Sequence, residues 1–380
     1  MRILHTADLH LGRQFNGLAL EDDHAAVLDQ IVATIREHRP RALVIAGDIF
    51  DRAVPPASAV RQFNGFLARV VAETEAAVVL LAGNHDQADR IGAMALLSDP
   101  RRALIRGPVQ AAEPPLILSD AQGPVAISAL PFAHEHAARA AFGDETLQSP
   151  EAVLAAQVAA ARAEVPGGAR WVIAAHAFVS GAVGSEGERP LTRVGGIETV
   201  RPEIFAGATY VALGHLHRPQ TVGLPTIRYA GAPLAFGFDE AGHDKSMSLV
   251  TLDGAGGARG TTVTPIPFRP RRRLRSLTGR HADLMREAPS EDFFKVVLTD
   301  QAPVIDAMKR LRAVFPNTCD LSYARAAVPR GRARAAPTAE TDPLALVTGF
   351  VAAVRDAPSA AERQVLASAL ARIGAEGDAP

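Results

Sequence analysis

Apolar and polar positions follow a strand, helix, strand order along the first part of the chain. Residues 2–7, 41–46 and 77–82 are short apolar runs rich in β-branched side chains, which is typical of buried parallel strands. Between them, residues 23–38 and 57–74 carry apolar side chains at helical spacing. This order predicts a parallel α/β sheet whose faces are covered by helices.

The chain becomes richer in predicted strands after a short helix at 91–98. Further strands are predicted at 103–106, 116–118, 125–130, 170–175, 210–213, 226–230, 246–252 and 261–268, with a helix at 150–164. The last three of these strands alternate in polarity, so we expect them to pair antiparallel and close a second sheet. The fold class that follows is α/β, with two stacked mixed β-sheets flanked by helices. A Gly- and Ser-rich stretch at 180–196 predicts a long surface loop.

The pattern divides the chain into a large domain and smaller parts. The parts are 1–270 (the two sheets), 271–325 (a small α+β domain), 326–342 (a flexible basic linker) and 343–375 (a helical segment). Within them, strands are predicted at 293–299 and 319–323, and helices at 303–314, 343–355 and 359–373. The run from Arg269 to Arg280 is interpreted as a bridge into the small domain.

Composition narrows the classes of protein to consider. The chain has 380 residues, of which 48% are hydrophobic and 21% charged, the profile of a soluble globular protein. Its formal net charge of −1 gives no overall attraction for DNA or a membrane, so a nucleic-acid surface must be local. Cys319 is the only cysteine, which excludes an internal disulfide or a thiolate cluster. With no signal-peptide pattern and no apolar run of about 18 residues, we expect a cytoplasmic protein without membrane contact.

Side chains that can bind metals follow several predicted strands at their carboxyl ends, where ligands bind in α/β sheets. They are Asp8, His10, Asp48, Asn84, His176, His215 and His217. Oxygen and imidazole ligands without sulfur suit Mn²⁺, Fe²⁺ or Zn²⁺ better than Ca²⁺ or Mg²⁺. These are too many ligands for one tetrahedral site, which favours two metals that share a bridging carboxylate and act on a phosphate.

The spacing of these residues also carries information. We expect Asp8-x-His10 and His215-x-His217 each to place two side chains on the same side of an extended segment. In the loop Gly83-Asn84-His85-Asp86, His85 offers an imidazole for acid–base chemistry and Asp86 is interpreted as shaping the turn.

The same residues carry a resemblance to calcineurin-like metallophosphoesterases. The shared motifs are Asp8-x-His10, Gly47-Asp48-x-x-Asp51-Arg52, Gly83-Asn84-His85-Asp86, His176 and Gly214-His215-x-His217. Residues 5–12, 47–56, 175–181 and 214–220 resemble more closely the SbcD family of bacterial nuclease subunits. The resemblance is specific over residues 1–270 and is one of architecture beyond them. It implies the calcineurin-like metallophosphoesterase fold with a small DNA-capping domain.

The resemblance also implies a role for each site residue. Two divalent ions, usually Mn²⁺, would bind the seven ligands: Asp8, His10, Asp48 and His217 for one, and Asp48, Asn84, His176 and His215 for the other. His85 would face the scissile phosphate and either protonate the leaving oxygen or stabilise the developing charge. Asp51 would orient His85, or would serve only as a helix N-cap or turn carboxylate. Arg52 would contact phosphate, or would form a solvated salt bridge.

The function implied is a Mn²⁺-dependent DNA nuclease of break repair, replication and recombination. It would act as a double-strand 3′→5′ exonuclease and a single-strand or hairpin endonuclease, gated by ATP through an SbcC-like coiled-coil ATPase of the ABC type. The chain has no Gly-rich, Lys-containing P-loop, so the ATP dependence would come from that partner. The resemblance further implies a homodimer through helices 57–74 and 91–98, and partner docking by the C-terminal helices. Alternatively, these last helices fold back on their own core.

Other interpretations stay open at this point. The arginines of 269–280, together with Arg325, Arg330, Arg332 and Arg334, could bind DNA phosphates or form a solvated charged linker. The same metal core could act on a small nucleotide or a phosphoprotein. A scaffold that tethers DNA ends without cutting is a third possibility, although it would not need His85 and seven ligands together.

Overall fold

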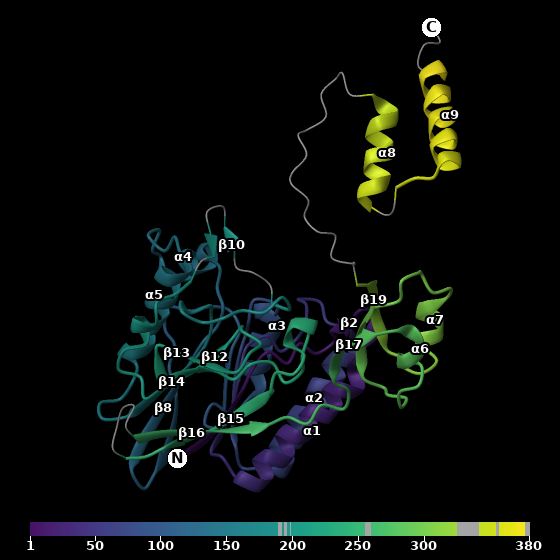
Figure 1. Ribbon diagram of the computed structural model, residues 1–380. Coiled ribbons are helices and arrows are strands. Elements are labelled where there is room, and N and C mark those ends of the chain that lie inside the picture. Colours follow the sequence, from purple (N-terminus) through teal and green to yellow (C-terminus); the bar gives the residue numbers. More distant parts are fainter. Residues whose placement is uncertain are drawn as a thin grey trace. The chain divides into compact units, whose positions relative to one another are not determined.

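The computed structural model describes residues 1–188, 192–193, 196–197, 199–254, 260–324, 342–354 and 357–376. They belong to two compact units, Met1–Ser322 and Tyr323–Pro380 (Figure 1). Of the expected linker at 326–342, only Asp342 is among the described residues. The arginines Arg325, Arg330, Arg332 and Arg334 lie outside them, so the structure does not bear on their role.

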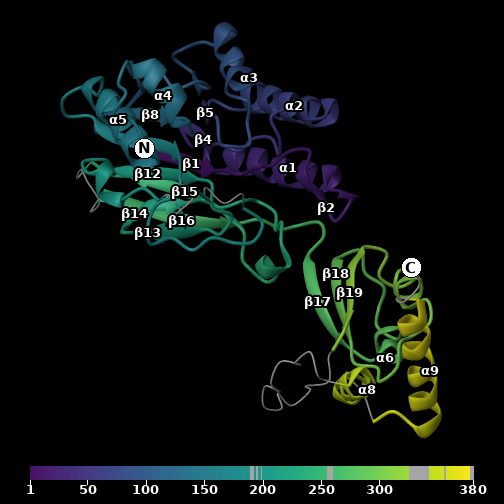
Figure 2. The same ribbon diagram turned by 90° about the horizontal axis from the view of Figure 1, so that it is seen from above.

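The first sheet has the strand order β16-β15-β1-β4-β5-β6. Its parallel strands are β1 (Arg2–Thr6), β4 (Ala42–Ala46), β5 (Ala77–Leu81) and β6 (Ala103–Arg106), and its antiparallel strands are β15 (Ser246–Leu252) and β16 (Thr261–Pro267). Helices α1 (Glu21–His38) and α2 (Ala57–Glu73) lie side by side (Figure 2). Their apolar side chains, such as Val27 and Phe63, share a core cluster with Ile45 of β4, so they cover one face of the sheet.

The second sheet has the order β13-β14-β12-β9-β8-β7. Its strands are β7 (Leu116–Asp120), β8 (Gly123–Leu130), β9 (Arg170–His176), β12 (Tyr210–Gly214), β13 (Gln220–Val222) and β14 (Leu224–Tyr229). Helix α5 (Pro150–Ala163) covers its outer face through Leu154 and Val158. Val44 and Val79 of the first sheet share an inner core with Ile127 and Val172 of the second. The predicted pair of stacked mixed sheets flanked by helices is therefore confirmed.

The expected membership of the second sheet was wrong for two strands. Strand β15 pairs with β1, with Ile3 opposite Val250, and β16 continues outward from β15 in the first sheet. Leu249 belongs to the helix-covered core and Val250 to the inner core, so β15 is buried on both faces. Alternating polarity shows which side chains are buried but not which strand is the neighbour, and the neighbour here comes from the start of the chain.

A separate three-stranded sheet forms the core of the small α+β part. It consists of β17 (Leu274–Gly279), β18 (Phe293–Leu298) and β19 (Thr318–Tyr323), accompanied by α6 (His281–Leu284) and α7 (Ala307–Leu311). Phe294 and Phe315 lie in its core. Strand β17 falls in the arginine run that was interpreted as a bridge, and the helix expected at 303–314 is confined to α7. The division at residues 270/271 stays a prediction, because Phe293 of this sheet packs against Phe15 of the larger part.

The arginine run is partly tied to neighbouring acids. Arg271 pairs with Asp22, Arg275 lies 3.7 Å from Asp292, and Arg272 binds the buried Asp23. The Arg272 guanidinium also lies 4.4 Å from the centre of the Phe293 ring. Within the described residues, the guanidinium groups of Arg269, Arg273 and Arg280 form neither an ion pair nor a hydrogen bond. Three of the six arginines are thus paired with acids of the chain, so the run is more than a solvated charged linker, and the three exposed guanidinium groups can still bind phosphate.

Shorter elements connect these sheets. They are β2 (Gln14–Phe15), β3 (Leu18–Ala19), α3 (Ala88–Ala93), η1 (Met94–Leu97), α4 (Glu135–Phe142), β10 (Thr192–Arg193), β11 (Gly196–Ile197), η2 (Pro202–Phe205) and η3 (Phe238–Glu240). The second unit contains α8 (Pro343–Val354) and α9 (Ala360–Glu376), which contact each other and expose Leu346, Phe350 and Val365. None of the helices in the described part of the chain has the length and apolar character needed to cross a membrane.

One buried histidine joins the two sheets inside the sandwich. The His5 side chain on β1 is fully buried, with Nδ1 3.0 Å from the hydroxyl of Tyr210 on β12 and Nε2 3.2 Å from the carbonyl oxygen of Leu213. Because a carbonyl only accepts, Nε2 carries the proton and Nδ1 accepts from the hydroxyl. Burial lowers the pKa of His5 from 6.5 to about 3, so the ring is neutral in the folded protein.

We predict that His5 makes the fold sensitive to acid. Unfolded His5 takes up a proton below pH 6.5 and the folded ring resists it until about pH 3, so stability is lost as the pH falls between these values. The free energy of unfolding, measured with urea at a series of pH values, should decrease with falling pH in the wild type. This pH dependence should exceed that of His5→Gln by up to about 1.4 kcal/mol per pH unit. The exposed His136, changed to Gln, should leave the slope unchanged, and parallel curves for wild type and His5→Gln would contradict the assignment.

Candidate functional site

The carboxyl ends of five strands from the two sheets meet at one edge of the sandwich. The loops after β1 and β4 are joined by backbone hydrogen bonds, from Asp8 N to Gly47 O and from His10 N to Asp48 O, each 3.0 Å long. The Asp8 carboxylate crosses to the other sheet, where it accepts from the backbone N–H of His215 at 2.9 Å. The predicted ligands therefore come together because the loops that carry them are directly bonded to one another.

Several of these residues have a backbone conformation that is uncommon outside glycine. The φ angles are 54° for Asp8, 46° for His10, 49° for Asp48 and 106° for His215. Such conformations cost free energy and persist only where the surrounding structure holds them. They also correct the expectation that the Asp8-x-His10 and His215-x-His217 pairs lie on extended segments. The side chains reach the site through sharp turns instead.

Two glycines let the strand ends approach closely enough for this arrangement. A Cβ on Gly83 would collide with the Asp48 carboxylate, and one on Gly214 would collide with the carbonyl oxygen of Ala46. Both contacts join loops from different strands. The glycines that precede Asn84 and His215 in the sequence are thus required by this close packing, since neither has a positive φ angle.

One group of ligand atoms gathers around His10. Its Nε2 lies 3.1 Å from Nε2 of His217 and 3.8 Å from Oδ2 of Asp48. Donor atoms of Asp8, His10 and Asp48 all lie within 4.8 Å of one another. All four of these residues are buried, so the group is closed to bulk water on most sides.

A second group gathers around Asn84. Its Oδ1 lies 2.9 Å from Nε2 of His176 and 3.0 Å from Nδ1 of His215. Asp48 joins this group too, because its Oδ2 is 3.5 Å from Nε2 of His176 and its donor atoms lie within 4.8 Å of those of His176 and His215. The Asp48 carboxylate is therefore shared between the two groups.

The lone pairs in these groups point at one another. The Nδ1 atom of His176 is 2.9 Å from the carbonyl oxygen of Ala46, so Nδ1 donates, and in the neutral ring Nε2 presents a lone pair to the Asn84 oxygen. A second proton on the ring, rotation of the Asn84 amide or a cation between the two atoms relieves this contact. Imidazole, carboxylate and amide donors suit a divalent transition metal of the Mn²⁺, Fe²⁺ or Zn²⁺ type, so the residues present fit a metal.

The ionisable groups respond to this crowding. Burial raises the pKa of the Asp8 carboxyl well above its ordinary value and lowers the pKa of His215 to about 3. Burial also opposes a charge on His176, but the neighbouring Asp48 carboxylate raises the pKa of His176 to about 9. The same imidazolium holds the pKa of Asp48 well below its ordinary value in spite of burial. The buried, ionised Asp48 carboxylate is therefore stabilised by positive charge beside it.

His85 lies beside the two groups with a different environment. Its Nδ1 is 2.8 Å from the carbonyl oxygen of Asp51, so Nδ1 donates and Nε2 is the basic atom. That Nε2 lies 4.0 Å from Oδ2 of Asp48, and the side chain is 12% exposed. The ring is therefore fixed at one nitrogen while the other faces the ligand cluster.

Asp51 contacts the site through both its backbone carbonyl and its side-chain carboxylate. Its backbone carbonyl contacts His85, whereas its carboxylate lies 3.7 Å from Nδ1 of His10 and 3.5 Å from the guanidinium of Arg13. Donor atoms of His10, Asp51 and His85 also form a third compact group that the sequence did not predict. Arg52 is exposed, and its side chain contacts no partner among the described residues.

Asp86 connects the loops after β4 and β5. Its carboxylate accepts from the backbone N–H groups of Ile49 at 3.0 Å, Phe50 at 2.9 Å and Gly83 at 3.0 Å. Burial and the nearby Asp48 charge raise the pKa of Asp86 to about 6. The sequence interpretation of Asp86 as a turn residue covered only Gly83, because the bonds to Ile49 and Phe50 cross to another loop.

Sequence reasoning missed three charged residues that surround the site. Arg13 lies 4.5 Å above the Phe236 ring and donates to the carbonyl oxygen of Gly187 at 3.0 Å. Glu188 accepts from the backbone N–H of His217 at 2.6 Å, and Glu240 lies 3.4 Å from its ring. These residues stand in irregular segments without periodic pattern.

Comparison with protein-family models gives two matches. Residues 1–219, more than half of the chain, match the calcineurin-like phosphoesterase model. Residues 270–355 match the SbcD C-terminal domain model, described as the type 5 capsule protein repressor C-terminal domain. The first match contains all seven candidate ligands, and the second contains the β17–β19 sheet and α8. Together they support an SbcD-type protein, as the sequence motifs indicated.

We predict that Asp86 is needed to hold the ligand loops together. In Asp86→Ala, three backbone N–H groups lose their acceptor, which should lower the free energy of unfolding by about 3 kcal/mol. Urea unfolding of the metal-free protein measures the change. Asp89→Ala removes an exposed carboxylate from the same stretch and should leave the stability almost unchanged. Equal stability of the two variants would show that the Asp86 contacts contribute little.

Proposed function

The chain belongs to the calcineurin-like phosphoesterase family, and on this premise we propose that it is an SbcD-like, Mn²⁺-dependent DNA nuclease. The proposed activities are a double-strand 3′→5′ exonuclease and a single-strand or hairpin endonuclease for DNA repair, replication and recombination. The observation that carries the proposal is the convergence of two ligand groups on the shared Asp48 carboxylate, with His85 beside them.

We assign the ligands to two metal ions. Asp8, His10, Asp48 and His217 would hold one, and Asp48, Asn84, His176 and His215 the other. Two such ions supply charge stabilisation for a phosphate and a deprotonated water near neutral pH. The protein would orient one of these ligands, His176, through the hydrogen bond from its outer nitrogen to the Ala46 carbonyl.

His85 is proposed to supply the proton for the leaving oxygen. Because Nδ1 is occupied by the Asp51 carbonyl, the proton would be held and released at Nε2, which faces the cluster. Positioned acids of this kind accelerate hydrolysis by about 100- to 10,000-fold. Asp51 would orient the ring through its backbone, and its carboxylate would orient His10.

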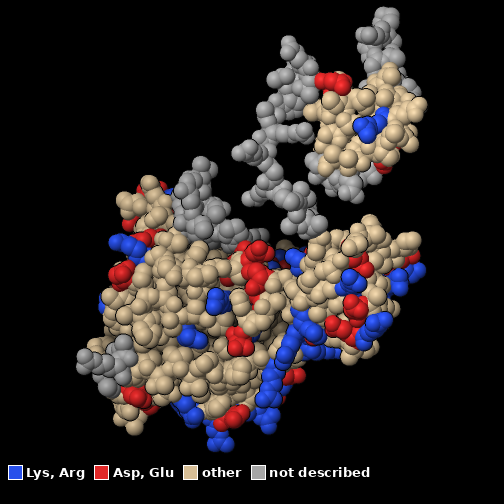
Figure 3. Space-filling view, viewed as in Figure 1, with Lys and Arg blue, Asp and Glu red and all other residues tan. Residues whose placement is uncertain are grey.

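DNA is the proposed substrate because of features beyond the metal cluster. A band of Lys and Arg side chains crosses the face shown in Figure 3, in the region where Figure 1 draws α1 and β17. Arg269, Arg273 and Arg280, in the segment that runs from the end of β16 to the start of α6, are exposed, so their guanidinium groups can neutralise phosphates. We also propose that Arg52, exposed beside the site, contacts the substrate backbone. A phosphoesterase for small nucleotides or phosphoproteins would not need this surface.

Two further partners are proposed on the family resemblance. An SbcC-like ATPase would dock on α8 and α9, whose exposed Phe350 and Val365 provide apolar contact surface. A second copy of the chain would pack against α2 and the α3–η1 segment, where Leu96 is 83% and Leu97 98% exposed. ATP hydrolysis by the partner would gate access to the nuclease site.

We predict that His85 and Asp48 can be separated by their effects. His85→Asn should retain Mn²⁺ binding in calorimetry but cut labelled hairpin DNA at least about 100-fold more slowly. Asp48→Ala should lose both Mn²⁺ binding and cutting, because the carboxylate is shared by both ligand groups. His134→Asn changes an exposed histidine and should behave as wild type. Intact cutting by Asp48→Ala would refute the bridging role.

The substrate panel for this assay also tests the rival functions. Hairpin and double-stranded DNA should be cut with Mn²⁺ and protected by EDTA, while cyclic nucleotides and phosphopeptides should be turned over poorly. The reverse preference would identify a small-substrate phosphoesterase. Binding of DNA without any cutting in Mn²⁺ would instead favour a scaffold that tethers DNA ends.

We predict that the exposed aromatic residue of α8 is required for partner docking. Phe350→Asp places a charge on a side chain that is 68% exposed, so it should leave the fold intact but abolish copurification with an SbcC-like ATPase. Nuclease activity of the isolated chain should be unchanged. Arg363→Ala, an exposed change on α9, serves as the control. Normal copurification of Phe350→Asp would place the docking surface elsewhere.

A further inference from the structure

A buried carboxylate lies on the side of His217 that faces away from the other candidate ligands. The two ring nitrogens of His217 have different neighbours: Nε2 is 3.1 Å from Nε2 of His10, and Nδ1 is 3.4 Å from Oε1 of Glu240. Glu240, the last residue of η3, is 1% exposed. Because a carboxylate only accepts, it keeps the proton on Nδ1 and leaves the Nε2 lone pair directed at the cluster.

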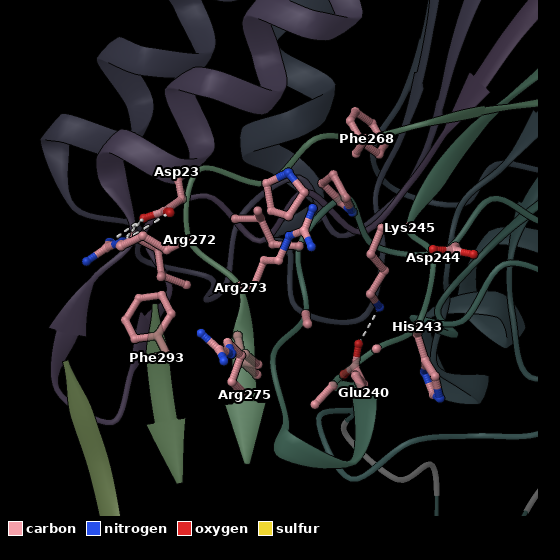
Figure 4. A pocket seen from close by; sticks show the side chains of 18 of the residues that line it. Asp23, Glu240, His243, Asp244, Lys245, Phe268, Arg272, Arg273, Arg275 and Phe293 are labelled. Atoms are coloured by element: carbon pink, nitrogen blue, oxygen red, sulfur yellow. Dashed lines mark hydrogen bonds and ion pairs between the residues drawn. The ribbon is translucent and has the colours of Figure 1, made fainter. Parts of the chain in front are cut away.

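Lys245 completes this arrangement from the segment before β15. Its ammonium group is bound to Oε2 of Glu240 (Figure 4). The same ammonium group donates to the carbonyl oxygen of His217 at 2.8 Å. Lys245 is only 7% exposed, so both charges of the pair are removed from water. The pair therefore holds the ring and the backbone of the same residue, His217, at one time.

The remaining candidate histidines are held in other ways. Nδ1 of His176 contacts a backbone carbonyl, and the carboxylate nearest to Nδ1 of His10, that of Asp51, is 3.7 Å away and 20% exposed. Among the described residues, His217 is the only histidine of the two ligand groups that contacts a fully buried, lysine-paired carboxylate from outside those groups. Such a contact favours one tautomer and one ring orientation more strongly than a neutral acceptor does.

The pair also lies between His217 and a cavity. Glu240 and Lys245 line a cavity of about 400 Å³ whose wall includes the Asp23–Arg272 pair, whereas His217 does not line it (Figure 4). Without the charged pair, water from this cavity could reach the Nδ1 side of the ring. The His217 orientation would then be set by exchangeable solvent and no longer by a fixed acceptor.

We propose that Glu240 and Lys245 are positioning residues that fix His217 and thereby set the affinity of the metal site that contains it. This inference rests on the proposed two-metal function. Neither residue would touch the metal or the substrate. Partners of metal-bound histidines typically change metal affinity by about 10- to 100-fold when they are removed.

The test is calorimetric titration of the metal-free chain with MnCl₂, without DNA. The wild type should bind two ions, and Glu240→Gln should weaken one of the two binding events by about 10- to 100-fold. The other event, assigned to Asn84, His176 and His215, should keep its affinity. The double variant Glu240→Gln/Lys245→Met leaves no unpaired buried charge and should show the same selective loss, with a melting temperature close to that of the wild type.

Asp244→Asn is the matched control, because Asp244 lines the same cavity but is exposed and lies in the same loop. It should bind both ions with wild-type affinity. Unchanged affinities in Glu240→Gln and the double variant would overturn the inference, and so would an equal loss at both sites or an equal loss in Asp244→Asn. A wild-type chain that binds no Mn²⁺ would contradict the proposed function instead.

Discussion

Carboxylates that accept hydrogen bonds from backbone amides hold the strand ends of the two sheets together. Asp8 accepts from His215 of the opposite sheet, Asp48 accepts from His85, and Asp86 accepts from three amides of two loops. A buried carboxylate is stable only when it is hydrogen-bonded and its charge is balanced. The carboxylates that connect the strand ends therefore also supply the negative charge that a cation can balance. The same residues stabilise the fold and form the site.

The hydrogen bonds between the strand ends also hold several site residues in uncommon backbone conformations. Asp8, His10, Asp48 and His215 hold positive φ angles at a free-energy cost that loose loops would not sustain. The cost is balanced by the cross-loop hydrogen bonds and by the close approach that Gly83 allows. Glycines, strained turns and acidic residues occur together at this edge. The glycines allow the loops to approach, and the carboxylates bind backbone amides that hold the strained turns in place.

The sequence was informative wherever the signal is local. Strand, helix and loop patterns located β1, β4 and β5 and the polar residues behind them, because period and turn chemistry are properties of neighbouring residues. It was misleading for β15, whose partner β1 lies at the other end of the chain, and for β17, whose two leucines are three residues apart in an arginine-rich run. The roles of Asp86 and Glu240 were invisible for the same reason, since their partners belong to loops that are distant in sequence.

The arginine run shows how the same residue type takes two roles within a few positions. Arg272 is bound to the buried Asp23 of α1 and stacked on Phe293 of β18, so its charge is used within the protein and fixes the small sheet to the helix. Arg273, its neighbour, is exposed and forms no such contact within the described residues. The number of basic residues in a stretch therefore overstates the charge available to DNA. The charge available to DNA comes from the guanidinium groups that form no ion pair with an acid in the described part of the chain, and in this run these are Arg269, Arg273 and Arg280.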